Sequence, residues 1–204
     1  YKYKDSLFQL RLKRILDILF SLFLLIISIP LILIALFLIF LEDQGSLFYI
    51  QLRTGKDEKP FYIFKLRTMR ENAENGKAKW SQKNDKRITK VGSFLRKTRI
   101  DELPQLINVI KGEMSLIGPR PERPEFDAIL KKEVSFYSLR YKIKPGLSGW
   151  AQINYNYTAS KEASKIKLGY DLFYLSNFSI FLDLLIFFKT MKAVFNAKGA
   201  ISKE

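Results

Sequence analysis

The chain has 204 residues, a formal net charge of +15, no Cys and no His, and a hydrophobic fraction of 48% that is unevenly distributed. This length is sufficient for a domain with its own core, and the missing residue types exclude imidazole bases, thiolate nucleophiles and metal sites held by His or Cys. Any catalytic group must therefore be a carboxylate, Lys, Tyr or Ser, and the lack of Cys excludes a disulfide framework and fits a reducing compartment.

The segment from Ile15 to Leu41 is apolar except for Asp17, Ser21, Ser28 and Pro30. As a helix it would be roughly 40 Å long, which exceeds the ~30 Å hydrocarbon core of a bilayer. It is too long for a cleaved signal peptide, and no small-residue cleavage site follows it. The segment is therefore predicted to lie in a membrane.

Charge on both flanks bears on how this segment enters the membrane. Basic residues precede it and the basic remainder of the chain follows it, so the positive-inside rule places both flanks on the cytoplasmic side. At Ser28-Ile29-Pro30, Pro removes a backbone donor and the Ser hydroxyl can bind a freed backbone group. A kink there would return the helix to the side from which it came, so we expect a re-entrant helix. The alternative is a tilted spanning helix with an ordinary proline kink.

The composition changes after this segment, which divides the chain into a basic flank with the membrane helix, residues 1–41, and a second domain, residues 42–204. Residues 51–100 contain 15 Lys and Arg against 5 Asp and Glu. Such a surface attracts lipid headgroups, nucleotide phosphates or nucleic acid.

Residues 61–68 alternate in polarity and predict a strand. In that register Lys65 and Arg67 lie on the same face as Ile63. Two neighbouring cations favour a bound anion between them, but a solvated edge strand explains them equally well. The polar residues 69–92, with little periodicity, predict a long surface loop over a site.

The next apolar residues recur at helical spacing, and Pro104 is tolerated only in the first turn of such a helix. They are Ile100, Leu103, Leu106, Ile107 and Ile110. Asp101 then lies at or next to the helix N-terminus, where it is either an N-cap or an ionised carboxylate beside a phosphate-binding helix end. Asp101 and Glu102 could hold one Mg²⁺ together, or divide the roles of nucleophile and metal ligand. Adjacent acids alone are a weak signal.

A Pro-rich segment, Gly118-Pro119-Arg120-Pro121, follows this helix. The two prolines restrict the backbone on both sides of Arg120 and so pre-orient its guanidinium for bidentate phosphate binding. A rigid surface linker without a ligand is the alternative. The turn-rich residues 144–150 suit either a close backbone approach to a ligand or a plain loop. Residues 178–195 predict an interfacial amphipathic helix, with packing into the core as the alternative.

Taken together, these motifs resemble the monotopic phosphoglycosyl transferases, the bacterial sugar transferases that start membrane glycan assembly. The motifs occur in order from about Arg11 to Gly199. They are the break at Ser28-Ile29-Pro30, Phe64-Lys65-Leu66-Arg67-Thr68-Met69, Asp101-Glu102-Leu103-Pro104-Gln105-Leu106, Lys111-Gly112-Glu113-Met114-Ser115, Gly118-Pro119-Arg120-Pro121, residues 144–152 and Tyr170-Asp171-Leu172-Phe173-Tyr174. Residues 149–152 and the closing segment are more similar to larger members of the family. Because the chain also begins at Tyr1, we expect it to be the catalytic part of such a member.

The resemblance implies a fold and a reaction. The fold is α+β but mainly α, with a re-entrant N-terminal membrane helix, a small strand element and amphipathic interfacial helices. The reaction moves a sugar 1-phosphate from a UDP-sugar to polyprenyl (undecaprenyl) phosphate, requires Mg²⁺, and yields a polyprenyl-diphosphate-sugar and UMP. The expected location is the cytoplasmic face of the bacterial inner membrane.

The resemblance also implies roles for individual residues. Asp101 would be the nucleophile that forms an aspartyl phosphosugar, and Glu102 its metal-binding or proton-handling partner. The cations expected to neutralise the diphosphate are Lys65, Arg67, Arg99 and Arg120, with Pro119 and Pro121 framing the last of these.

The expected partners are a UDP-sugar, polyprenyl phosphate and membrane lipids, with no nucleic acid, and a homo-oligomer is left open. The nearest alternative function is a membrane-associated, metal-dependent glycosyl transferase, which would release UDP instead of UMP. A non-enzymatic scaffold that binds anionic lipids is a further alternative. A nucleic-acid binder would explain the charge, but the sequence contains no groove-reading motif.

Overall fold

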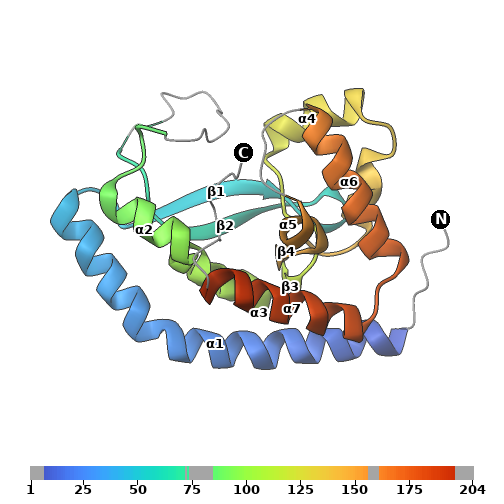
Figure 1. The fold of residues 1–204 in the computed structure, drawn as a ribbon, viewed down its shortest axis with the longest axis horizontal. Helices are drawn as coiled ribbons and strands as arrows, with labels where there is room; N and C mark the ends of the chain where they lie inside the picture. The colour runs from blue at the N-terminus through green and yellow to red at the C-terminus, as the bar shows by residue number, and fades with distance from the viewer. Residues whose placement is uncertain (1–6, 72, 74–84, 156–160, 196–204) are drawn as a thin grey trace.

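The computed structural model describes residues 7–71, 73, 85–155 and 161–195. In chain order the elements are α1 (Leu7–Glu42), β1 (Phe48–Thr54), the 3₁₀ turn η1 (Lys56–Glu58), β2 (Pro60–Leu66), α2 (Lys90–Thr98), η2 (Ile100–Gln105), α3 (Leu106–Lys111), β3 (Ser115–Ile117), α4 (Pro124–Glu133), η3 (Tyr137–Lys142), β4 (Gly146–Ser148), α5 (Trp150–Asn154), α6 (Lys161–Ser176) and α7 (Ile180–Phe195). A long helix runs along one side of a domain of shorter helices and two small sheets (Figure 1). The expected α+β, mainly α fold class is confirmed.

Helix α1 is apolar on its outside and polar on its inside. Within the described residues it is long and apolar enough to cross a membrane. Many of its large apolar side chains are exposed, and Phe23 and Phe37, for example, are each 61% exposed. The polar residues that interrupt the apolar run, Asp17, Ser21 and Ser28, are all buried against the rest of the protein. A water-soluble helix has the reverse arrangement, so the exposed side of α1 suits lipid.

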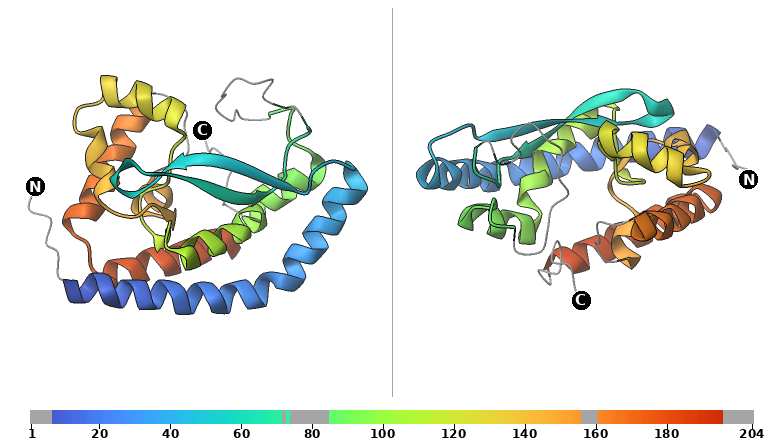
Figure 2. Two further views of the ribbon diagram at one scale, coloured as in Figure 1. Left: turned by 180° about the vertical axis from the view of Figure 1, so that it is seen from behind. Right: turned by 90° about the horizontal axis from the view of Figure 1, so that it is seen from above.

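The sharp break expected at Pro30 is absent, because α1 remains one helix from Leu7 to Glu42 with Pro30 inside it. The helix bends instead, as both Figure 1 and the left view of Figure 2 show. Ser28 donates its hydroxyl proton to the Leu25 carbonyl at 3.0 Å, a contact that accompanies helix bending. The loss of one backbone donor at Pro30 is therefore accommodated by bending without ending the helix.

The first half of α1 is bound to the domain by polar contacts. Lys13 Nζ lies 2.6 Å from a carboxylate oxygen of Asp183 in α7. Arg14 donates to two carbonyls at the end of α3, at 2.6 and 2.7 Å. Asp17 accepts a hydrogen bond from the Leu116 amide in β3 at 3.1 Å.

The second half of α1 is bound to the same domain. Ile39 packs in a cluster with Leu66 and Leu95 from β2 and α2. The carboxylate of Glu42 accepts the first backbone amides of α2 at 2.7 and 3.0 Å. Both ends of α1 are therefore attached to one folded domain.

The hairpin of β1 and β2 is antiparallel, with Arg53 opposite Phe61 and Tyr49 opposite Lys65. The strand expected at residues 61–68 is confirmed, although it ends at Leu66. Phe61 and Ile63 enter the main core, where they join residues of α3, α6 and α7. Seen from above in Figure 2, the hairpin lies on one side of the molecule and α6 and α7 on the other.

The segment around Asp101 differs from the predicted helix. Arg99 has a left-handed backbone (φ 60°), which ends α2, and a 3₁₀ turn then runs to Gln105 before α3 begins at Leu106. The helical segment predicted from Ile100 is therefore confirmed in position, but its first six residues are 3₁₀ and not α-helical. Arg99 is the N-cap residue, so the N-cap interpretation of Asp101 is wrong. Asp101 lies in the first turn of η2, where Pro104 does not have to supply an α-helical amide bond.

The predicted loop at residues 69–92 is partly wrong. Residues 72 and 74–84 lie outside the described residues, and Met69 pairs with Ile88 in an isolated bridge. Helix α2 then begins at Lys90, after an N-cap in which Thr89 accepts from the Gly92 amide at 2.9 Å. This nine-residue helix has a weak sequence signal, because it is short and few of its residues are apolar.

Strands β3 and β4 pair in parallel and bring two distant loops together. Gly118 and Gly146 cross so closely that a Cβ on Gly146 would lie 2.0 Å from the Gly118 nitrogen.

Helix α7 is amphipathic, with Ile186 fully buried and Phe181 and Phe188 exposed by 76% and 66%. Helix α7 thus packs one face into the core and leaves aromatic side chains exposed on another.

The close crossing of Gly118 and Gly146 predicts the effect of adding one methyl group. Gly146→Ala should destabilise the fold by about 2 kcal/mol, because the new Cβ collides with backbone atoms that cannot move independently. Gly169→Ala is the matched control, since a Cβ at this position in α6 meets no atom within 4 Å and should stabilise by about 0.5–1 kcal/mol. Thermal unfolding in detergent measures both, and equal midpoints for the two variants would contradict the close crossing.

Candidate active site

Glu102 is a buried carboxylate held by cations from three segments. Its Oε1 accepts from Lys65 Nζ at 2.8 Å and from Arg120 Nη2 at 2.5 Å. Its Oε2 lies 3.3 Å from Arg99 Nη1. Burial alone would raise the pKa of Glu102, but the charges of Arg120, Lys65 and Arg99 hold it well below its usual range. Glu102 is therefore a fixed negative charge.

Asp101 is equally buried but has no such partners. It is 6% exposed, and within the described part of the chain its carboxylate makes no hydrogen bond or ion pair. Burial and the neighbouring charge of Glu102 raise the pKa of Asp101 to about 6, against the opposing effect of Lys65, Arg96 and Arg120. Above that pH it is an ionised carboxylate without a bound proton donor, which is the form that a nucleophile requires.

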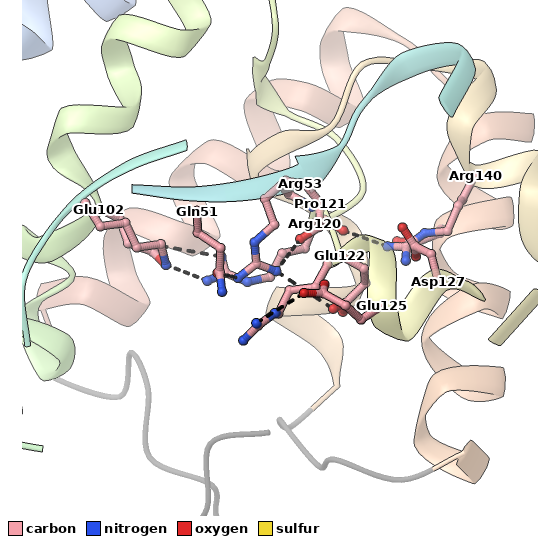
Figure 3. Close-up of polar contacts among 12 residues, drawn as sticks. Gln51, Arg53, Glu102, Arg120, Pro121, Glu122, Glu125, Asp127 and Arg140 are labelled. Carbon is pink, nitrogen blue, oxygen red and sulfur yellow. Dashed lines mark hydrogen bonds and ion pairs between the residues drawn. The ribbon is translucent and has the colours of Figure 1, made fainter. Parts of the chain in front are cut away.

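Three different local structures present the cations to Glu102. Lys65 comes from β2, and burial lowers its pKa while the charge of Glu102 acts in the opposite direction. Arg99 is the left-handed residue between α2 and η2. Arg120 comes from the segment after β3, and Figure 3 shows its guanidinium directed at Glu102. The site is therefore assembled from segments that are distant in sequence.

The segment around Arg120 is not a surface linker. Gly118, Pro119 and Pro121 are buried, while Arg120 itself is partly exposed. The two prolines thus pack into the protein and leave the guanidinium free to extend toward Glu102. The surface-linker alternative is therefore wrong, and phosphate binding by Arg120 stays a prediction.

The structure does not bring every predicted residue to this site. Arg67 is buried at the end of the hairpin, where its guanidinium lies 3.5 Å from the Asp43 carboxylate and 3.4 Å from that of Glu71. It joins β2 to the segment after α1. Ser28 and Pro30 lie in α1 and contribute to its bend.

Two further residues were missed by sequence reasoning. Arg96 of α2 donates to the Thr68 hydroxyl at 2.8 Å, and its charge lowers the pKa of Asp101. Asn108 of α3 is fully buried and donates to the Tyr62 carbonyl and to Glu113, each at 2.7 Å. Arg96 could have been found from its helical spacing to Arg99, had α2 been predicted. Asn108 was missed because its contacts with β2, at the Phe64 amide and the Tyr62 carbonyl, join residues distant in sequence.

The acidic residues fit a Mg²⁺ ion only together with a substrate. Within the described residues there is no group of three or more His, Cys, Asp or Glu that could hold a metal. Mg²⁺ in phosphoryl-transfer sites is held by one or two carboxylates together with phosphate oxygens and water. Neither oxygen of Asp101 is engaged by a described residue, whereas both oxygens of Glu102 are engaged by cations. Asp101 therefore fits as a ligand directly, and Glu102 fits when a cation moves to the substrate.

Comparison with known proteins gives a consistent result. The sequence profile of the bacterial sugar transferases matches residues 8–197. The UDP-N-acetylgalactosamine-undecaprenyl-phosphate N-acetylgalactosaminephosphotransferase of Aeromonas hydrophila is 44% identical over 189 residues, covering 93% of this chain and 45% of that protein. The UDP-glucose:undecaprenyl-phosphate glucose-1-phosphate transferase of Klebsiella pneumoniae is 40% identical over 194 residues, covering 94% of this chain and 41% of that protein. The chain thus spans less than half the length of these two relatives.

A shorter relative is also similar along most of its length. The UDP-glucose:undecaprenyl-phosphate glucose-1-phosphate transferase of Caulobacter vibrioides is 36% identical over 190 residues. The match covers 92% of this chain and 71% of that protein. The matched region includes the site described above in each of the three relatives.

The electrostatics of the pair predict opposite effects of two substitutions on Asp101. Glu102→Gln removes the neighbouring negative charge and should lower the pKa of Asp101 below about 6, whereas Lys65→Met removes a cation and should raise it. The ¹³C carboxyl shift of Asp101, assigned by its absence in Asp101→Asn, gives the midpoint. An unchanged midpoint in Glu102→Gln would show that the two carboxylates do not interact.

Proposed function

Because the chain belongs to the bacterial sugar transferase family, we propose that it transfers a sugar 1-phosphate from a UDP-sugar to polyprenyl phosphate and releases UMP. The observation that carries this proposal is the pair of unlike carboxylates, in which Asp101 makes no hydrogen bond among the described residues and Glu102 is held by Lys65, Arg99 and Arg120. The names of the relatives, which act on undecaprenyl phosphate, support the acceptor.

The first step uses Asp101 as the nucleophile. One of its oxygens attacks the phosphorus that carries the sugar, a phosphorus–oxygen bond forms, and the bond from that phosphorus to the bridging oxygen breaks. The electron pair leaves with UMP, and the product is an aspartyl phosphosugar. Carboxylates form such intermediates in other phosphoryl transfers. The raised pKa of Asp101 leaves it ionised at neutral pH while retaining more basicity than an ordinary Asp.

The second step returns Asp101 to its starting state. An oxygen of polyprenyl phosphate attacks the same phosphorus, and the bond to Asp101 breaks with its electron pair. The product is a polyprenyl-diphosphate-sugar. Both steps concentrate negative charge, so catalysis depends mainly on positioning and charge neutralisation.

The cations around Glu102 provide that neutralisation. Lys65 and Arg120 share one carboxylate oxygen, so each can direct a donor toward phosphate oxygens without leaving Glu102 unpaired. Mg²⁺, held by Asp101 and Glu102, would supply further neutralisation of the diphosphate when bound. Glu102 then keeps the cations in place between turnovers.

The membrane arrangement follows from α1. Both of its halves are bound to the same basic domain, which supports a re-entrant helix with both ends on the cytoplasmic face. The donor then reaches the site from the cytoplasm, and the lipid phosphate reaches it from the bilayer surface. The relatives use N-acetylgalactosamine and glucose donors, so both sugars should be tested.

The reaction predicts a specific by-product. Protein in nanodiscs with Mg²⁺, undecaprenyl phosphate, and UDP-N-acetylgalactosamine or UDP-glucose should release UMP, and Asp101→Asn should reduce this release by more than about 10³-fold. With a donor carrying ³²P in the sugar-linked phosphate, the label should bind covalently to the wild-type protein but not to Asp101→Asn.

Asp183→Asn serves as the control for this experiment, because Asp183 is also a buried Asp but binds Lys13 away from the site. It should retain UMP release. Release of UDP would indicate a glycosyl transferase, and UMP release that survives in Asp101→Asn would refute the nucleophile.

The re-entrant arrangement predicts that both flanks of α1 are accessible from one side. The chain has no Cys, so single Cys substitutions at the exposed residues Phe8 and Lys56 report position without background. In inside-out membrane vesicles a membrane-impermeant maleimide should label both variants, and in intact spheroplasts it should label neither. Labelling of the two positions from opposite sides would establish a spanning helix instead.

A further inference from the structure

The segment from Pro119 to Glu122 is held by an unusual set of hydrogen bonds. Its four consecutive backbone carbonyls are each bound by a different donor from elsewhere in the chain. In order, the donors are the Gly146 amide at 2.9 Å, Arg140 Nη2 at 2.7 Å, Arg53 Nη1 at 3.0 Å and the Thr54 amide at 3.0 Å. The donors belong to β4, η3 and β1, so three separate elements fix one short segment.

The sequence of this segment makes external donors necessary. Pro119 and Pro121 have no amide proton, so the segment cannot form a regular ladder of its own. Buried backbone carbonyls require partners, and these come from the surrounding elements. Two of the four donors are guanidinium groups, whose hydrogen bonds are stronger than those of neutral donors.

Arg140 is itself held by buried polar side chains. It is 7% exposed and forms an ion pair with the buried Asp171 of α6, at 2.9 Å. Its other terminal nitrogen donates to the Tyr137 hydroxyl at 2.6 Å, and Tyr137 donates to Asp127 at 3.2 Å. A buried ion pair contributes little to stability compared with apolar packing, but its contacts fix the position of the Arg140 guanidinium.

Arg120 is thereby held at its backbone carbonyl and at its guanidinium. Its carbonyl is held by Arg140, and its guanidinium binds Glu102 (Figure 3). Fixing the carbonyl fixes the peptide plane and therefore the direction in which the side chain leaves the backbone. A displacement of about 1 Å at a reacting centre can reduce the rate by about 10²-fold.

We propose that Arg140 and Asp171, with Arg53 as a second clamp on the same segment, are positioning residues that set the Arg120 guanidinium relative to Asp101. They do not contact the substrate and act only through Arg120. The effect on turnover rests on the function proposed above, whereas the effect on the segment itself does not.

A double-mutant cycle on UMP release tests this dependence. Arg120→Ala should lower kcat/KM by about 10²–10³-fold and Arg140→Gln by about 10- to 100-fold. In the Arg120→Ala background, Arg140→Gln should change kcat/KM by less than about twofold, because the residue through which it acts is gone. Arg140→Lys, which keeps the charge and a donor, should recover part of the loss.

The matched control is Asp183→Asn, which alters another buried ion pair, Lys13–Asp183, that does not touch the segment. Any loss that it causes should be the same factor in both backgrounds. If the loss from Arg140→Gln is likewise the same in both backgrounds, Arg140 has only a structural role and the proposal is overturned.

Hydrogen exchange provides a readout that does not depend on activity. Arg140→Gln should increase amide exchange at Arg120 and Glu122 by at least about tenfold, and Asp183→Asn should not. If Arg140→Gln does not fold, two other variants replace it. Arg140→Gln with Asp171→Asn removes both charges together, and Arg53→Gln tests the less buried clamp.

The two readouts separate the two proposals. Unchanged exchange in every clamp variant overturns the positioning role even if the wild-type protein releases UMP. Faster exchange in the clamp variants of a protein that releases no UMP supports the positioning role and refutes the function.

Discussion

The burial of Glu102 is the constraint on which the site depends. A carboxylate removed from water costs several kcal/mol unless cations compensate for it. The cations come from β2, the α2–η2 junction and the Pro-rich segment, so these parts must converge for the protein to fold. The same convergence places Asp101 next to a fixed negative charge, and that charge contributes to its raised pKa. Structural stability and chemical reactivity of the pair thus have one electrostatic origin.

In α1, too, the placement of polar and apolar residues follows from whether they need partners within the protein. Its apolar side chains need no partner within the protein, while Asp17, Ser21 and Ser28 face the domain. The polar positions of α1 therefore mark where the domain packs, and the exposed apolar positions form a surface that suits lipid. The active-site elements η2 and α3 rest on this polar face, since Arg14 binds the carbonyl end of α3. This contact fixes the candidate site relative to α1.

Residues whose role depends on local chemistry could be predicted from the sequence. Asp101 and Glu102 are adjacent, Arg120 is framed by prolines, and Lys65 lies in an alternating strand, so each was identified and the structure brings all four together. Arg67 had the same local signal as Lys65, but the strand ends between them and Arg67 binds Asp43 and Glu71. The 3₁₀ turn could not be foreseen because it depends on the left-handed Arg99. Arg53, Asn108 and Arg140 were missed because each binds a backbone carbonyl 20 to 68 residues away, where no periodic pattern extends.

The contact between Lys13 and Asp183 has a consequence for the order of events during synthesis. The two residues are separated by 170 positions, so α1 leaves the ribosome long before α7 exists. Until then, Lys13 has no carboxylate partner, whereas the partners of Arg14 and Asp17 in α3 and β3 are synthesised earlier. The docking of α7 closes a loop between residues 170 positions apart, which is a slow class of folding event. A nascent chain interrupted before residue 183 would contain the candidate site residues but would leave Lys13 without its ion-pair partner.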